Sequence, residues 1–319
     1  MKNILFTFLA FLISLNTWSQ EYRTDIPVHD PVMIKDGDTY YLFCTGPGIA
    51  FWSSPDMVQW KREEPVFPEP PTWATSVAAD FKNHIWAPDI TYHKGEYYLY
   101  YSISSFAKNT SAIGLVKNKT LNPDSPDYKW EDQGIVVQSV PGRDLWNAID
   151  PNLVFDEEGT PWLNYGSFWN GMKLDRLADD LKTVQTGPDD WYTISRRPRT
   201  FELDDRNPGD GAVEAPFIFK KDDWYYLFVS FDYCCRGVNS TYKMVVGRSK
   251  DVTGPYLDRE GQSMFEGGGT LVLEGNENWH GVGHNSAYTF DGTDYLIFHG
   301  YDANDNGRSK LLIRKMDWD

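Results

Sequence analysis

Three short segments of the chain place a carboxylic acid at the start of an apolar run. They read VHDPVMIKDG at 28–37, IDPNLVFDEEG at 149–159 and VEAPFIFKKDD at 213–223, and their acids are Asp30, Asp150 and Glu214. A carboxylate before proline can be simple turn chemistry, but three buried together repel one another and lose hydration. We therefore interpret the trio as catalytic. Glycoside hydrolysis needs one carboxyl group to protonate the leaving oxygen and another to activate water or attack carbon. A third raises the pKa of the acid.

Five copies of a hairpin signal must position these acids. Each copy places turn residues before a run of aromatic and aliphatic residues. The copies are DGDTYYLF (36–43), KGEYYLYYS (94–102), EGTPWLNYGS (158–167), KDDWYYLFVS (221–230) and DGTDYLIFHG (291–300). A short apolar strand precedes each copy, and these strands begin at Asp30-Pro31, Pro88-Asp89, Asp150-Pro151, Glu214-Ala215-Pro216 and His284-Asn285.

Repeated units of about four short strands predict an all-β fold, namely a five-bladed β-propeller formed by a single domain over 20–319. A two-sheet sandwich is the other architecture considered, but it would not explain the period. The first strand of each propeller blade lines the central axis. Asp30, Asp150, Glu214 and His284 should therefore meet at one end of the channel. Helical periodicity is nearly absent, with a hint of a turn or two at 174–183.

The composition favours an exported protein that handles sugars. Acidic residues outnumber basic ones 46 to 30, and such a surface repels nucleic acid and anionic lipid. Aromatic residues make up 16% of the chain, which suits both β-sheet cores and stacking on sugar rings. We expect no nucleic-acid or membrane partner for the mature chain, and we expect a monomer.

The N-terminus resembles a secretory signal. MKNILFTFLAFLISLNTWSQ holds one lysine and then an apolar run from Ile4 to Leu15 that is too short to span a bilayer. Thr17 and Ser19 suit cleavage before Gln20. We interpret residues 1–19 as a signal peptide, rather than a membrane anchor, and expect a secreted or periplasmic protein.

The three cysteines imply no disulfide framework. Cys234 and Cys235 are adjacent, and neighbouring cysteines rarely meet disulfide geometry. We expect all three, including Cys44, to be buried free thiols, with a strained Cys234–Cys235 bridge as the alternative.

Taken in order, the motifs resemble glycoside hydrolase family 43. They are HDP, WAPDI, AIDPNLVFD, YGSFW, VEAP, FDYCCRGVNSTY and GHNS, and the similarity runs from about residue 25 to the C-terminus. The likeness is strongest to the endo-α-1,5-L-arabinanases of that family. It implies a five-bladed propeller that hydrolyses arabinan or arabino-oligosaccharides with inversion of configuration.

The resemblance also implies roles for individual residues. Asp30 is similar to the general base that deprotonates water, Glu214 to the general acid, and Asp150 to the third carboxylate that tunes Glu214 and positions the sugar. Inversion leaves room for a water, so the base and acid carboxyl groups are expected roughly 6.5–9.5 Å apart. His29 is expected to orient Asp30. Expected substrate contacts, besides Asp30 and Asp150, are Trp86, Phe106, Lys108, Asn147, Ala148, Ile149, Ser167, Phe168 and Trp169. For each aromatic residue, packing between blades is the alternative role.

Related arabinanases hold calcium in the axial channel, mostly through waters and one histidine. His284 of GHNS matches that histidine, and water-rich oxygen coordination suits Ca²⁺. The other interpretation is a histidine that only bonds a neighbouring strand. No HxH or HExxH spacing occurs among the six histidines, which argues against a zinc site.

Several alternatives remain open at this stage. The protein could be an exo-acting α-L-arabinofuranosidase or a β-xylosidase on the same scaffold, or a carbohydrate-binding propeller without catalysis. A retaining mechanism would bring the carboxyl pair closer, to roughly 5–5.5 Å. Finally, the chain ends at KMDWD, and a fifth blade without an outer strand would close the propeller weakly.

Overall fold

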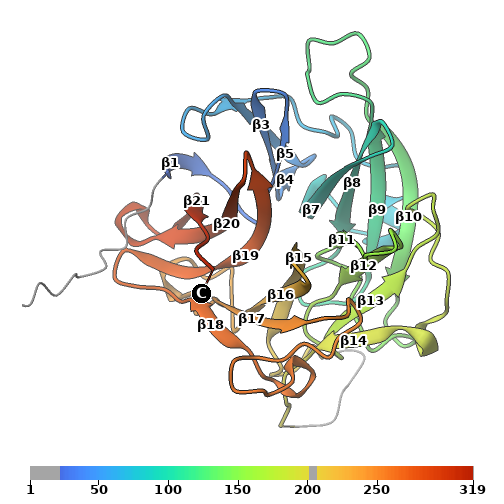
Figure 1. Cartoon of the computed structure of the whole chain (residues 1–319). Coiled ribbons are helices and arrows are strands. Elements are labelled where there is room, and N and C mark those ends of the chain that lie inside the picture. The colour runs from blue at the N-terminus through green and yellow to red at the C-terminus, as the bar shows by residue number, and fades with distance from the viewer. Residues whose placement is uncertain (1–21, 201–206, 319) are drawn as a thin grey trace, which may run out of the picture.

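Each of the five expected hairpins forms the inner half of an antiparallel sheet, and the five sheets are arranged as the blades of a propeller (Figure 1). The computed structural model describes residues 22–200 and 207–318. The expected signal peptide at 1–19 lies outside these residues. No helix in this part of the chain is long and apolar enough to cross a bilayer.

Blades 1 and 2 come from the first half of the chain. Blade 1 consists, from the axis outward, of β2 (Val32–Asp36), β3 (Thr39–Cys44), β5 (Ala50–Ser54) and β6 (Lys61–Arg62). Blade 2 consists of β7 (His84–His93), β8 (Glu96–Ile103), β9 (Ser111–Asn118) and β10 (Glu131–Ser139), and the short β4 (Gly46–Pro47) pairs with β7.

Blades 3 and 4 follow the same order. Blade 3 consists of β11 (Asn152–Phe155), β12 (Pro161–Tyr165), β13 (Met172–Arg176) and β14 (Tyr192–Ser195). Blade 4 consists of β15 (Val213–Lys221), β16 (Trp224–Phe231), β17 (Lys243–Ser249) and β18 (Thr270–Leu273). The hint of a helix at 174–183 was wrong, because this stretch finishes β13 and then turns.

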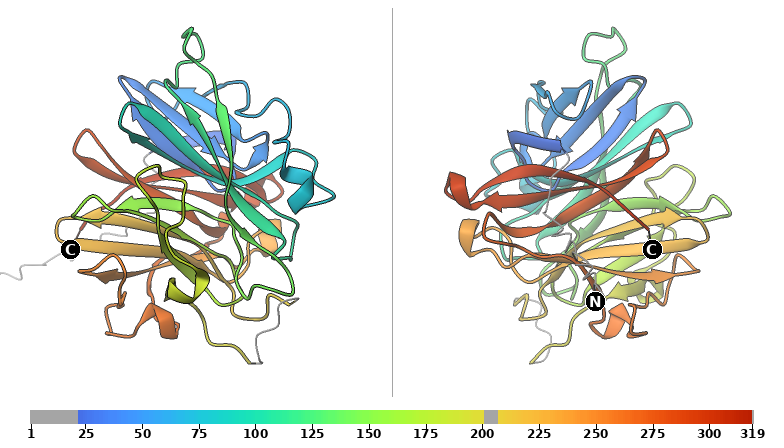
Figure 2. Two further views of the ribbon diagram at one scale, coloured as in Figure 1. Left: turned by 90° about the vertical axis from the view of Figure 1, so that its right-hand side faces the viewer. Right: turned by 60° about the vertical axis from the view of Figure 1, so that its left-hand side comes forward.

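Blade 5 joins the two ends of the described chain. It consists of β19 (Trp279–Phe290), β20 (Thr293–Asp302), β21 (Arg308–Lys315) and, as its outer strand, β1 (Tyr22–Pro27). β1 pairs antiparallel with β21. The fifth blade therefore does have an outer strand, and the pairing of both ends of the chain in one sheet closes the ring (Figure 2).

Helices are short and lie outside the blades. Within the described ranges, the α-helix is α1 (Ala74–Val77), and the 3-10 helices are η1 (Pro188–Asp190), η2 (Gly237–Asn239), η3 (Met264–Glu266) and η4 (Ala303–Asp305).

Apolar side chains on both faces of each sheet explain why the blades pack around an axis. In β3, Leu42 joins the core shared with blade 5, whereas Tyr41 and Phe43 join the core shared with blade 2. This follows from the period of two, which sends successive side chains to opposite faces. Among the described residues, one such core fills each of the five gaps between neighbouring blades. The innermost strands β2, β7, β11, β15 and β19 contact one another in turn around the axis.

Candidate active site

One backbone feature recurs at the entrance of all five innermost strands. The residues there have a left-handed backbone, with φ between 39° and 59°, and they are Asp30, Ala87, Asp150, Ala215 and His284. In four of them a proline follows. Non-glycine residues rarely adopt this conformation, so each blade holds it against a cost of order 1–3 kcal/mol.

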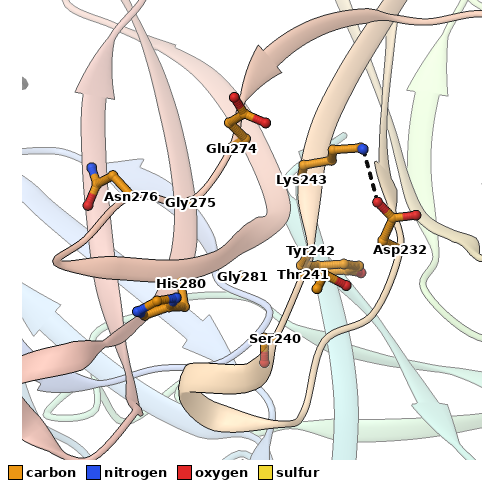
Figure 3. A pocket seen from close by; sticks show the side chains of 10 residues that line it. All are labelled: Asp232, Ser240, Thr241, Tyr242, Lys243, Glu274, Gly275, Asn276, His280 and Gly281. Atoms are coloured by element: carbon orange, nitrogen blue, oxygen red, sulfur yellow. Dashed lines mark ion pairs between the residues drawn. The ribbon is translucent and has the colours of Figure 1, made fainter.

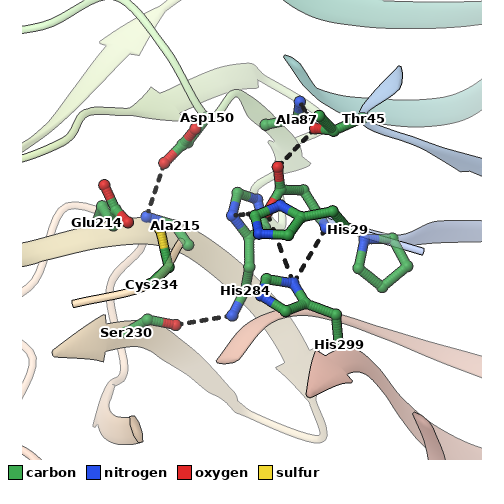
Figure 4. A network of polar contacts seen from close by, with 12 residues as sticks. His29, Thr45, Ala87, Asp150, Glu214, Ala215, Ser230, Cys234, His284 and His299 are labelled. Carbon is green, nitrogen blue, oxygen red and sulfur yellow. Dashed lines mark hydrogen bonds and ion pairs between the residues drawn. The ribbon is translucent and has the colours of Figure 1, made fainter. Parts of the chain in front are cut away.

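A hydrogen bond to the preceding blade holds each of these residues. The backbone N–H of Ala87 donates to Thr45 Oγ1 at 2.8 Å, and that of His284 donates to Ser230 Oγ at 2.9 Å. The backbone N–H of Asp150 donates to Ser102 Oγ, that of Ala215 to Asp150 Oδ2, and that of Asp30 to His299 Nδ1. Figure 4 shows several of these contacts. The seams between blades therefore fix where the axial side chains lie.

The three carboxylates do not all occupy the same position in their blades. Asp30 and Asp150 occupy equivalent positions, but Glu214 stands one residue earlier than its blade 4 counterpart, Ala215. Asp89 likewise lies two residues beyond Ala87 and accepts the backbone N–H of Leu153 at 2.8 Å. The acid stands directly before the proline in blades 1 and 3, which read DP. It stands two residues before the proline in blade 4, which reads EAP, and directly after it in blade 2, which reads APD.

Asp30 is held in a shell of polar groups. Its carboxyl group is buried, with Oδ1 2.8 Å from His29 Nδ1 and 2.9 Å from His284 Nδ1. Thr45 donates to Oδ2 at 2.5 Å. Burial would raise the pKa of Asp30, but His284 and His29 outweigh it and hold that pKa well below its usual range. Asp30 is thus an ionised carboxylate at neutral pH, as a general base must be.

Glu214 and Asp150 form the other side of the site. Ser167 donates to Glu214 Oε2 at 2.7 Å, and Tyr242 donates to Oε1 at 2.8 Å. Burial, with the charges of Glu214 and Asp30 as further contributions, raises the pKa of Asp150 to about 8 despite the opposing effect of His284. Asp150 therefore holds a proton at neutral pH, so it adds no full negative charge beside Glu214.

Comparison with known proteins identifies the family of this chain. The model for glycosyl hydrolases family 43 matches residues 25–319. The chain belongs to this family.

Two relatives and one solved structure show how similar the chain is to other members of family 43. It is 56% identical to the extracellular exo-α-(1→5)-L-arabinofuranosidase of Cellvibrio japonicus, over 92% of this chain and 84% of that protein. It is 45% identical to the extracellular endo-α-(1→5)-L-arabinanase 1 of Bacillus subtilis, over 91% and 85%. The structure of a Cellvibrio cellulosa α-L-arabinanase complexed with arabinohexaose aligns with a TM-score of 0.89 at 55% identity, covering 92% of this chain and 93% of that one.

In this family 43 protein, two expected substrate contacts lie at the surface on the loop after β8. Phe106 is 75% exposed, and Lys108 is also exposed. Trp86 precedes Ala87 at the entrance of β7, and its indole N–H donates to His84 Nδ1 at 3.1 Å. Phe106 and Lys108 are open to solvent and Trp86 is half-buried, and the binding roles of all three remain predictions.

The expected contacts around Asp150 are more buried. Asn147 Oδ1 accepts a hydrogen bond from Ser111 at 2.7 Å, and Ala148 and Ile149 are covered. Ser167 reaches Glu214 directly, and its neighbour Phe168 packs 6.0 Å from the Tyr233 ring.

Trp169 is 2% exposed. Stacking of its indole on a sugar would therefore require the loop to move, so its burial favours the packing role.

The adjacent cysteines overturn another prediction. Cys234 and Cys235 form a disulfide, and neither is buried, whereas Cys44 is a buried free thiol as expected. The loop between β16 and β17, with Cys235 in a left-handed conformation at φ 64°, brings the two sulfurs together. Nothing in the sequence except the adjacency itself could have indicated the pairing.

The residues around His284 fit a cation that is bound mainly through water. His284 Nδ1 faces Asp30, which leaves only Nε2 as a ligand atom. Burial lowers the pKa of His284, but Asp30 and Asp150 outweigh it and raise that pKa to about 9, so a cation would have to displace the Nε2 proton. The next residue, Asn285, is 2% exposed, and its Oδ1 and Nδ2 have no partner among the described residues. Buried polar groups normally bind protein or ordered water, so this strand suits a hydrated channel, and Ca²⁺ accepts such coordination.

A polar pocket of about 340 Å³ lies between blades 4 and 5 (Figure 3). Tyr242 lines it and also bonds Glu214. Lys243 on its wall pairs with Asp232 at 3.0 Å. The pocket therefore borders the site through Tyr242.

Proposed function

We propose that this protein is an exported enzyme that hydrolyses the α-1,5-L-arabinofuranosyl bonds of arabinan with inversion of configuration. The observation that carries the proposal is the arrangement of an ionised Asp30, a proton-holding Asp150 and Glu214, whose segment is tied to Asp150 through the Ala215 N–H. The substrate class follows from the relatives, which are named for arabinan-type bonds. Export is supported by their description as extracellular.

The proposed mechanism assigns one step to each carboxyl group. Asp30 accepts a proton from the water that attacks the anomeric carbon, since His29 and His284 keep it ionised. Glu214 protonates the departing glycosidic oxygen, and the hydroxyl groups of Ser167 and Tyr242 hold its two oxygens in place. Asp150 accepts the Ala215 N–H and so fixes the segment that carries Glu214. His284 would contribute Nε2 to a calcium ion in the channel, and that ion would supply positive charge near the base.

Two modes of attack are candidates. The sequence motifs predict endo action on internal bonds. The higher identity to the exo-acting relative, 56% against 45% for the endo-acting one, favours release of short products from chain ends.

Products from debranched linear arabinan test the activity and the mode together. Chromatography over time should show a ladder of shrinking oligosaccharides for endo action, or one short product from the start for exo action. Proton NMR of the first product should show the β-anomer, as inversion requires. Initial release of the α-anomer would indicate a retaining enzyme. An absence of hydrolysis on arabinan, xylan and arabinoxylan would favour a binding protein.

A further inference from the structure

The disulfide lies beside the catalytic base. The sulfur atoms of Cys234 and Cys235 and a ring nitrogen of His29 all lie within 4.8 Å of one another. His29 in turn lies against Asp30. The disulfide thus belongs to the wall of the site, although it comes from blade 4 and the base from blade 1.

The loop that carries the disulfide is held at both ends. Asp232 pairs with Arg197 at 2.7 Å and with Lys243 at 3.0 Å. The carbonyl oxygen of Tyr233 accepts the backbone N–H groups of Thr241 and Tyr242 at 2.9 and 3.1 Å. Because the loop is anchored in this way, the cysteine pair has little freedom to move as a rigid unit. The direction of the Cys235 N–H then depends on the local backbone conformation of the two cysteines.

Tyr301 connects the disulfide to His29. Its hydroxyl group accepts the backbone N–H of Cys235 at 2.7 Å and lies 2.7 Å from His29 Nε2. A tyrosine has one O–H to donate. The N–H of Cys235 takes up one acceptor position of this oxygen, and the O–H of Tyr301 remains available to donate to His29 Nε2.

A hydrogen bond donated by Tyr301 would set the tautomer of His29. An imidazole that accepts a hydrogen bond at Nε2 carries its proton on Nδ1 when neutral. Nδ1 is the atom that faces Asp30 Oδ1 at 2.8 Å. The ring of His299, stacked on His29 with centroids 3.9 Å apart, fixes the ring plane.

We propose that Tyr301 and the Cys234–Cys235 disulfide form a positioning unit for the catalytic base, acting through His29. The disulfide closes a small ring that fixes the direction of the Cys235 N–H, this N–H orients the Tyr301 hydroxyl, and the hydroxyl selects the His29 tautomer that donates to Asp30. Tyr301, Cys234 and Cys235 are thus positioning residues that need not touch the substrate. The inference rests on the proposed function, because Asp30 must be the base.

Tyr301→Phe is the first test, because it removes one oxygen and keeps a ring packed against His299. Loss of alignment should lower kcat about tenfold or more, with the KM for arabinan changed less than about twofold. Tyr295→Phe is the matched control: it lies on the same strand, β20, and loses a contact to Tyr22 that is remote from the site. Its kcat should equal that of the wild type.

Nitrogen NMR of the histidine rings provides a readout that a merely structural role would not move. The ring signals of His29 are those that disappear in the His29→Gln variant. In the wild type they should show a proton on Nδ1. Tyr301→Phe should show a mixture of tautomers, and Tyr295→Phe should not.

Reduction tests the disulfide. Treatment with a phosphine reductant should lower kcat of the wild type, and oxidation should restore it. The Cys234→Ser/Cys235→Ser double variant should have the kcat of the reduced wild type and no response to reductant. Circular dichroism would confirm that each protein is folded.

Unchanged kcat and unchanged His29 signals in both Tyr301→Phe and the reduced protein would overturn the inference, even if thermal stability fell. Asp30→Asn separates this from failure of the proposed function. An inactive Asp30→Asn with a fully active Tyr301→Phe would reject only the positioning unit, whereas an active Asp30→Asn would reject the assignment of the base itself.

Discussion

The backbone N–H of Ala215 donates to Oδ2 of Asp150 at 3.1 Å, so the third carboxylate is tied to the segment that carries the acid. Asp150 belongs to blade 3 and Ala215 to blade 4, which means that the acid is positioned across a seam between blades. The same residue also acts electrostatically, since its carboxyl group and Glu214 share one buried region. Substitutions of Asp150 can separate its hydrogen bond to Ala215 from its electrostatic effect on Glu214.

Asp150→Asn and Asp150→Ala should differ in activity. Asparagine keeps an oxygen that can accept the Ala215 N–H but cannot ionise, whereas alanine loses both functions. We expect kcat/KM to fall about tenfold or more in Asp150→Asn, because the amide is not ionisable, and by about a further tenfold in Asp150→Ala, because the acid is then also misplaced. Steady-state kinetics on linear arabinan would measure this. Equal activity of the two variants would show that the hydrogen bond to Ala215 does not matter.

Two aromatic residues with the same expected role should behave differently. Phe106 is 75% exposed and buries little, so Phe106→Ala should raise KM for arabinan while leaving the melting temperature unchanged. Trp169 is 2% exposed, and Trp169→Ala should cost about 3–5 kcal/mol of unfolding free energy. Kinetics and thermal melts of both variants test the pair. An unchanged KM in Phe106→Ala would remove it from the binding surface.

Asp89 should make stability depend on pH. Burial raises its pKa to about 7, so the folded state binds a proton that the unfolded chain has released above about pH 4. Its contribution is therefore fully present at low pH and is lost as the pH rises through 7. Asp89→Asn can still accept the Leu153 N–H and should remove this dependence. Between pH 5 and 8, the free energy of unfolding should therefore fall by about 3 kcal/mol more in the wild type than in the variant. Urea unfolding at both pH values would measure the difference. Identical changes in the two proteins would show that Asp89 does not hold the proton.

Calcium removal tests the role of His284. If Nε2 binds the ion, chelation should lower activity or the melting temperature, and added Ca²⁺ should restore it. The His284→Gln variant, already without this ligand, should respond less to the chelator. A wild type that keeps both its activity and its melting temperature after chelation would rule the site out.

The sequence predicts the fold well because its signals are local and repeated. Turn residues before aromatic runs, as at Asp36-Gly37 and Asp291-Gly292, define the inner hairpins of all the blades. The closing strand β1 could not be predicted in this way, since its partner β21 lies at the other end of the chain.

The site is predictable in part. Asp30 and Asp150 are identified by the DP motif, but the one-residue offset of Glu214 depends on the backbone bulge at Ala215. The contact of Tyr301 with His29 and Cys235 involves three separate segments, and no spacing in the chain reports it.

The most direct test of the account compares Glu214→Gln with the wild type on two substrates. On arabinan, loss of the proton donor should lower kcat about 10²–10⁴-fold, whereas an aryl α-L-arabinofuranoside with a good leaving group needs little protonation and should suffer much less. Glu158→Gln, an exposed change on the turn between β11 and β12, serves as the control and should be fully active. Equal losses on both substrates, or a fully active Glu214→Gln, would contradict the assignment of Glu214 as the acid.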